Sequence, residues 1–201
     1  MRRRLFSLNT LFILMAIIAV GILLIPRIIE GYQLQSKGIS YITSNIEDYY
    51  HKTFPQEGEH TVEIDLSDLE SNEGKVLFED SENKIYVTNV THSGSEYKVT
   101  FRSSGSYDKD GATLVSGLEH VHNNNGFTSH FNAEAEAVYK GETFDLSPSE
   151  SSGLNYRDGD EFGFYLIPPE QMKNIDSKEE PAVEVTVTNL QVNLWVEKSN
   201  K

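Results

Sequence analysis

The 201-residue chain contains no cysteine, a single tryptophan, and only 17 lysines and arginines against 31 aspartates and glutamates. The absence of cysteine excludes a disulfide framework, cysteine-ligated zinc, iron–sulfur clusters, thiol catalysis and a lipid-modified cysteine. The formal net charge of −14 argues against nucleic-acid binding, because phosphate contacts need lysine and arginine. The length allows one domain and an anchor.

The few basic residues are unevenly distributed along the chain. Residues 1–30 hold four basic residues and one acidic residue, so residues 31–201 hold 13 basic and 30 acidic residues, a net charge of −17. The basic and acidic parts are therefore expected to face different environments.

A long apolar run follows the basic start. Residues 8–29 contain only Asn9, Thr10 and Arg27 as polar members, and about 20 apolar residues suffice to span a bilayer as a helix. We predict a transmembrane signal-anchor through the lipid bilayer over residues 8–29. By the positive-inside rule, residues 1–7 form a cytoplasmic tail and the rest of the chain is extracytoplasmic. The alternative is a cleaved signal peptide, but the small-residue site Ala19-Val20-Gly21 lies inside the apolar run.

The segment Phe6-Ser7-Leu8-Asn9-Thr10-Leu11 resembles the start of type IV pilins and pseudopilins. The resemblance implies an extended helical spine, a β-domain and a role as an assembly subunit. It covers roughly the first 50 residues. Leu5 replaces the glycine that the processing peptidase needs, and Thr10 stands at the expected glutamate position.

Residues 30–58 are predicted to form a juxtamembrane helix or stalk, with the firm helix near residues 39–51. Apolar and aromatic residues recur there every three or four positions, for example at Ile39, Ile42 and Ile46. One interpretation is a coiled coil that dimerises the protein. The other, favoured by the shortness of the repeat, is a helix that packs its isoleucines on the following domain.

Residues 59–201 are predicted to form an all-β domain, an antiparallel β-sandwich of immunoglobulin-like or jelly-roll-like type. Polar and apolar residues alternate over 61–66, 75–78, 84–90 and 97–101, with turn-forming residues between these segments. No long helical pattern interrupts the strands, which argues against a parallel α/β sheet.

A predicted hairpin over 114–139 carries the best metal candidate, His120, His122 and His130. Imidazole groups two apart on a strand point to one side and suit zinc. A loop of even length places Leu118 or His120 opposite Phe131 and puts His130 on the other face. An odd loop would unite the histidines but would leave apolar residues facing acids, so the even register is expected.

Two acid-rich turns resemble fragments of calcium-binding loops. They contain Asp108 and Asp110 before Gly111, and Asp158 and Asp160 around a second glycine. Neither has the full ligand pattern of an EF-hand loop. Calcium at one of them is an alternative to simple solvated turns.

Tyr156 and Arg157 are candidate binding residues, because Arg157 is one of only two arginines after residue 30 and lies in a loop at a sandwich end. No sequence pattern of a hydrolase nucleophile, a zinc protease or a phosphate-binding loop is present. We therefore expect neither catalytic residues nor a bound cofactor.

The C-terminal run over 182–197 is expected to belong to the core. Val183, Val185 and Val187 occupy odd-numbered positions and would share one face of a strand. The apolar residues Leu190, Val192, Leu194 and Val196 occupy even-numbered positions and would face the other side. A bulge near residues 188–189 would restore a single buried face. Trp195 would then lie on the opposite face and cover a second surface.

The architecture resembles that of small envelope proteins of Gram-positive bacteria. We expect a non-catalytic binding or accessory module at the membrane surface, whose partner is another envelope protein or a cell-wall polymer. The alternatives are a zinc- or calcium-binding domain or enzyme that uses His120, His122 and His130, and a pseudopilin-like subunit.

Overall fold

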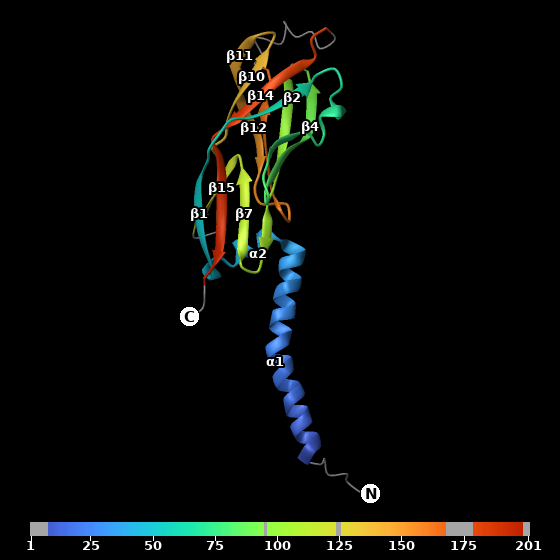
Figure 1. The fold of residues 1–201 in the computed structure, drawn as a ribbon, viewed down its shortest axis with the longest axis vertical. Helices are drawn as coiled ribbons and strands as arrows, with labels where there is room; N and C mark the ends of the chain where they lie inside the picture. The colour runs from blue at the N-terminus through green and yellow to red at the C-terminus, as the bar shows by residue number, and fades with distance from the viewer. Residues whose placement is uncertain (1–7, 95, 124–125, 168–178, 199–201) are drawn as a thin grey trace.

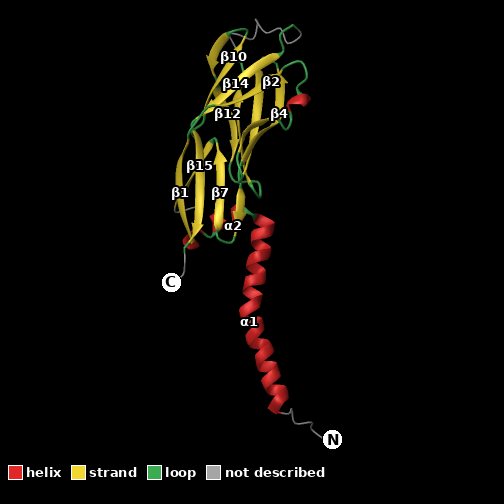
Figure 2. Cartoon of the chain, viewed as in Figure 1, coloured by secondary structure: helices red, strands yellow, loops and turns green. Residues whose placement is uncertain are grey.

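The computed structural model describes residues 8–94, 96–123, 126–167 and 179–198. A long helix, α1 (Leu8–Lys37), leads into a β-rich domain (Figures 1 and 2). The helix is long and apolar enough to cross a membrane, and none of its apolar stretch is buried within the protein. At 1.5 Å per residue it is about 45 Å long, so it extends beyond a hydrocarbon core of about 30 Å.

The chain after α1 differs from the predicted juxtamembrane helix. A short helix, α2 (Ile39–Ser44), and a single 3-10 turn, η1 (Ile46–Asp48), are followed at once by strand β1 (Tyr49–Gln56). The predicted helix to residue 51 is therefore wrong at its C-terminal end. All eight residues of β1 pair with β15 (Leu190–Glu197), and this pairing outweighs the local helical spacing.

The strands form three larger sheets and a separate hairpin, all with antiparallel pairing. The helix-side sheet has the order β1-β15-β7-β6, the distal sheet β11-β10-β14-β2, and the five-stranded sheet β12-β13-β5-β4-β3. Strands β8 and β9 form the hairpin. Figure 1 shows the distal sheet at the end of the domain far from α1.

The remaining strands and the second 3-10 turn complete the element order. They are β2 (His60–Asp65), η2 (Glu70–Asn72), β3 (Val76–Glu79), β4 (Lys84–Ser93), β5 (Glu96–Ser104), β6 (Ser106–Asp108), β7 (Gly111–Ser116), β8 (Leu118–Asn123), β9 (Gly126–Phe131), β10 (Glu134–Tyr139), β11 (Glu142–Asp145), β12 (Ser147–Ser152), β13 (Gly159–Tyr165) and β14 (Ala182–Thr188). The predicted strands over 61–66, 75–78, 84–90 and 97–101 are confirmed as β2 to β5 with shifted ends.

The main hydrophobic core lies between the distal sheet and the five-stranded sheet. Alternate residues of β14, namely Val183, Val185 and Val187, face Phe162 and Phe164 of β13 within one buried cluster. The predicted all-β fold with antiparallel sheets is therefore confirmed and its arrangement is sandwich-like, while the immunoglobulin-like or jelly-roll-like type stays a prediction. Each fully buried residue of this size contributes about 1.5–3 kcal/mol, so the core can hold the domain together without disulfides.

A second, smaller core joins the helical segment to the helix-side sheet. Ile39 and Ile42 of α2 are fully buried there against Leu114 and Trp195, and Leu34 of α1 packs on the cluster. The interpretation in which the isoleucines pack on the domain is therefore confirmed.

Strand β15 follows the predicted parity only at its start, where Leu190 is fully buried in the main core and Val192 packs against it. The chain passes from the distal sheet to the helix-side sheet at Asn189, which has a φ of 56°. No bulge restores one face. Gln191 and Asn193 are buried with Trp195, whereas Val196 is 45% exposed. The expectation that Trp195 covers a second surface is correct, and the expectation that Val196 faces the core is wrong.

Candidate functional site

The register of the β8–β9 hairpin separates the three candidate histidines. Leu118 pairs with Phe131, Glu119 with His130, and His120 with Ser129, which is the even register expected from burial. His120 is fully buried, His122 is exposed, and His130 lies on the other face of the hairpin. The structure does not bring these three together. Among the described residues, no group of three histidines and carboxylates could hold a metal ion.

His120 instead belongs to a buried polar chain that connects three strands. Its Nε2 lies 2.6 Å from Oδ2 of Asp160 on β13, and its Nδ1 lies 2.9 Å from Oγ of Ser129 on β9. The Ser116 hydroxyl donates to Asp160 at 2.8 Å and accepts the Leu118 N–H at 3.0 Å. The Asp160 carboxylate, which has no exposed surface, is thus fully engaged inside the protein.

Asn193 of β15 connects this chain to the helix-side sheet. Its Oδ1 accepts the backbone N–H of His120 at 2.9 Å, and its Nδ2 donates to the Leu118 carbonyl at 2.9 Å. These bonds explain why a polar residue replaces an apolar one on the buried side of β15. Buried polar groups are stable only when they are hydrogen-bonded, and here each of these bonds also fixes the position of β8.

The order serine, histidine, aspartate is the connectivity of a hydrolase triad. Such a triad needs its serine to meet a substrate beside positioned donors that stabilise an oxyanion. Neither Ser129 nor His120 lines the acidic groove described below. The geometry shows Ser129, His120 and Asp160 as a hydrogen-bonded series that connects β9, β8 and β13 inside the domain.

An aromatic group covers the other side of His120. His51 of β1 stacks on Trp195 with a centroid separation of 4.9 Å and meets Phe127 edge-on at 5.7 Å. Burial lowers the pKa of His51, and the neighbouring His120 and His122 lower it further, against the opposing effect of Glu119. The neutral imidazole is therefore favoured at this position.

The candidate calcium residues lie at two unconnected places. Asp108 closes its own turn by accepting the backbone N–H groups of Asp110 and Gly111 at 2.8 and 3.2 Å. Asp160 is the buried partner of His120. Asp158 accepts from Arg102 at 2.7 Å and from the Ser104 hydroxyl at 2.7 Å.

The environment of Asp158 favours its ionised form. Burial alone would raise its pKa, but the hydrogen bonds from Ser104 and Arg102 and the charge of Arg102 outweigh burial and lower the pKa below its usual value. Tyr156 covers the same guanidinium, with the Arg102 carbon 3.8 Å from the ring centroid. Tyr156 and Asp158 thus hold Arg102 between them.

Arg157 has a structural role that the sequence did not suggest. Its carbonyl accepts the backbone N–H of Ile39 at 2.8 Å, so the loop before β13 holds the start of α2. Gly38 has a φ of 58°, and a Cβ there would lie 1.8 Å from the Arg157 carbonyl oxygen. Only glycine fits this contact between the helical segment and the domain.

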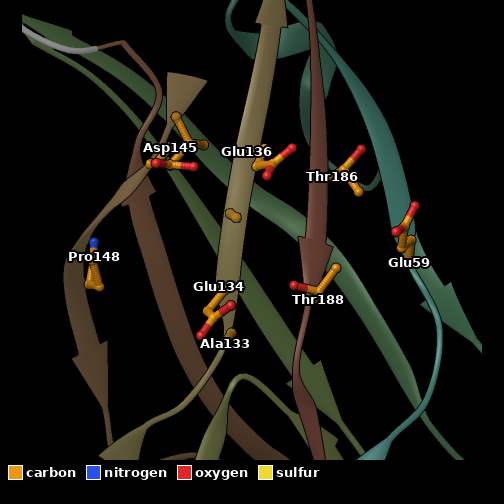
Figure 3. Close-up of a pocket in the computed structure, with 10 residues that line it drawn as sticks. Glu59, Ala133, Glu134, Glu136, Asp145, Pro148, Thr186 and Thr188 are labelled. Atoms are coloured by element: carbon orange, nitrogen blue, oxygen red, sulfur yellow. The ribbon is translucent and has the colours of Figure 1, made fainter. Parts of the chain in front are cut away.

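A concave, acidic groove of about 550 Å³ lies on the outer face of the distal sheet (Figure 3). Four carboxylates line it, together with the apolar and threonine residues Ala133, Ala135, Leu146, Pro148, Thr186 and Thr188. Figure 3 shows Glu134 and Glu136 on β10, Asp145 on β11, and Glu59 just before β2. None of the described residues that line the groove is a lysine or arginine, so this lining carries only negative charge.

Comparison with known proteins gives no relative for this chain: no protein family, no curated protein and no solved structure matches it.

Sequence reasoning missed Ser129, Ser116 and Asn193, and it did not pair His120 with Asp160. No local pattern signals these contacts, since His120 and Asp160 are 40 residues apart in sequence. The acidic groove was missed because its carboxylates come from separate strands.

Proposed function

We propose that this protein is a membrane-anchored, extracytoplasmic and non-catalytic binding module. In this proposal α1 crosses the cell membrane with the arginine-rich start on the cytoplasmic side. The β-domain stands outside the cell, and its acidic groove receives a cationic partner. The partner is a lysine- or arginine-rich segment of another envelope protein, or an ammonium-bearing cell-wall polymer.

The observation that carries the proposal is the groove. Its volume lies within the range of ligand-binding clefts, about 300–1,000 Å³. The Glu134 and Glu136 side chains project from alternate positions of one strand, and both are exposed. The side chains of these residues form no ion pair among the described residues. A cationic ligand would therefore not have to displace an internal partner.

The coupling of the anchor to the domain supports the same function. The Gly38–Arg157 contact and the second core attach the domain directly to α1, without a flexible linker. A binding module attached in this way presents its groove at a fixed height above the bilayer.

Photo-crosslinking in native membranes tests the proposal. A photoreactive amino acid replaces Thr188, which lines the groove, and crosslinked partners are identified by mass spectrometry. We expect a defined adduct with a cationic protein or wall fragment, weakened when the ionic strength is raised to about 0.5 M. The E134Q/E136Q double variant should lose the adduct.

The matched control is E73Q/E96Q, which changes the net charge equally at two exposed positions away from the groove. This control should retain the adduct. An adduct that survives in E134Q/E136Q, or that disappears equally in the control, would contradict groove binding.

A further inference from the structure

A second crevice, of about 440 Å³, lies between the outer part of α1 and the β-domain. Arg27, Glu30, Gly31 and Leu34 of α1 line one side. The other side is formed by residues from α2, the start of β1, the β6–β7 turn and the end of β15, namely Tyr41, Tyr49, Lys109 and Glu197. Figure 1 shows α1 meeting the domain next to α2 and the helix-side sheet.

The position of this crevice along α1 places it at a membrane surface, if α1 spans the bilayer as proposed. The uninterrupted apolar run ends at Pro26, and Arg27 is the first charged residue after it. About 20 residues cross the hydrocarbon core, so Arg27 and Glu30 lie at the level of the lipid headgroups. Lys109 and Glu197 share a crevice with them and therefore lie at the same level.

The charges that line the crevice are balanced. Arg27 and Lys109 are cationic, and Glu30 and Glu197 are anionic. Among the described residues, Arg27, Glu30 and Glu197 form no ion pair. Within the described part of the chain, Lys109 pairs only with its neighbour Asp110, at 3.4 Å, and both side chains are largely exposed. An exposed pair of this kind is worth little and can open for a ligand.

Two tyrosines line the crevice beside its carboxylates. Burial raises the pKa of Tyr49 to about 12, with further contributions from Glu197, Tyr41 and Glu30. Burial also raises the pKa of Tyr41, followed by the effects of Glu30 and Asp48. Both phenols therefore keep their protons, and the Tyr49 hydroxyl donates to the Lys109 carbonyl at 3.4 Å, which ties the β6–β7 turn to the crevice.

We propose that this crevice binds the headgroup of a zwitterionic phospholipid. The phosphodiester anion would lie between Arg27 and Lys109, and the ammonium group would lie against Glu30 and Glu197. Charge-assisted hydrogen bonds of both signs would then form around one ligand. A purely anionic headgroup would leave both carboxylates without a partner, and would meet them as like charges.

This inference rests on the proposed membrane anchoring of the full chain. The test reconstitutes the full chain in nanodiscs of phosphatidylethanolamine, phosphatidylcholine and phosphatidylglycerol in equal amounts. The protein is released into mild detergent, and retained lipid is counted by native mass spectrometry. We expect one zwitterionic lipid per chain, retained in preference to phosphatidylglycerol.

Substitutions outside the membrane segment locate the site. K109Q/E197Q should reduce the retained zwitterionic lipid by about tenfold, since one charge-assisted contact to each half of the headgroup is lost. The control K52Q/E96Q makes the same two changes at exposed positions outside the crevice, and it should retain lipid like the unmodified chain.

The possible outcomes separate this inference from the anchoring on which it rests. Extraction of the chain from membranes by alkaline carbonate would contradict the anchor itself. An integral chain that retains phosphatidylglycerol as well as or better than the zwitterionic lipids would overturn only the headgroup site. Equal retention by K109Q/E197Q and its control would also overturn it.

Discussion

His120 Nε2 and Asp160 Oδ2 lie 2.6 Å apart, and neither side chain has any surface exposed to solvent. The two residues come from β8 and β13, so this contact joins the hairpin to the five-stranded sheet. Breaking a buried pair by removing one partner is costly, because the other partner stays buried without compensation. Removing either residue of the pair should therefore lower the free energy of unfolding substantially.

Replacing Asp160 with alanine should lower the free energy of unfolding by about 3–5 kcal/mol. His120 would lose the partner of Nε2, and the Ser116 hydroxyl would lose its acceptor. The measurement is urea unfolding of the full chain in detergent, followed by the fluorescence of Trp195, the only tryptophan. E96A, at an exposed position, should change stability by no more than about 0.5 kcal/mol. A D160A effect as small as that of E96A would show that the pair carries no stability.

Gly38→Ala should loosen the attachment of the domain to α1. The residue has a left-handed backbone, and a Cβ would collide with the Arg157 carbonyl oxygen, so strain of about 1–3 kcal/mol is expected before any rearrangement. Because the chain has no cysteine, spin labels can be attached to cysteines that replace Tyr32 and Lys52 (Y32C and K52C). The distance distribution between the labels should broaden in G38A.

Gly31→Ala is the matched control for this experiment. An added Cβ at Gly31 meets nothing within 4 Å, and alanine is the better helix former. G31A should therefore keep the narrow distance distribution. Equal broadening in both variants would mean that the Gly38–Arg157 contact does not set the geometry of the joint.

Trp195→Ala should destabilise the domain by about 3–5 kcal/mol, because it removes the largest side chain of the second core. Val196→Ala, one residue later on the exposed side of β15, should cost about 0.5 kcal/mol. Thermal unfolding followed by circular dichroism measures both variants. The reverse ranking would contradict the orientation of β15.

Stability should decline as the pH falls below 6.5. Burial lowers the pKa of both His51 and His60 from the ordinary value of 6.5. The unfolded chain therefore takes up protons at these positions before the folded chain does. The stabilisation is present above pH 6.5 and is lost as the pH drops towards the folded pKa values.

Phenylalanine at both positions keeps the aromatic contacts and removes the titration. H51F/H60F should show a shallower loss of unfolding free energy between about pH 7.5 and pH 5 than the unmodified chain. Identical slopes of unfolding free energy against pH in the double variant and the unmodified chain would show that these two histidines do not cause the loss of stability at low pH.

Hydrophobic pattern predicted the long helix, strands β2 to β5 and the register of the β8–β9 hairpin. The predicted hairpin over 114–139 was too long, because β7 and β10 at its outer ends pair in two other sheets. The register followed because Leu118 and Phe131 must share a face, and a shift by one residue would expose one of them. The same reasoning failed on β15. There Asn193 is buried because of its bonds to His120 and Leu118, and hydropathy contains no information about such bonds.

Strand β1 and the His120–Asp160 pair are two features that local sequence spacing could not predict. Residues near Tyr49 have helical spacing, yet they form a strand because β15 is available to pair with them. His120 and Asp160 are brought together only by the packing of β8 against β13. Both contacts depend on long-range topology, which local spacing does not encode.

The domain is joined to α1 without a linker, and the acidic groove lies on the distal sheet. Figure 1 shows this sheet at the end of the domain far from α1. If α1 anchors the chain in a membrane as proposed, this geometry would select partners by their height above the bilayer. A membrane protein with only short external loops would pass beneath the groove, while one with a tall ectodomain, or a polymer strand lying above the bilayer, would meet it. The length of the β-domain would then limit which neighbours this protein can engage, before any affinity is considered.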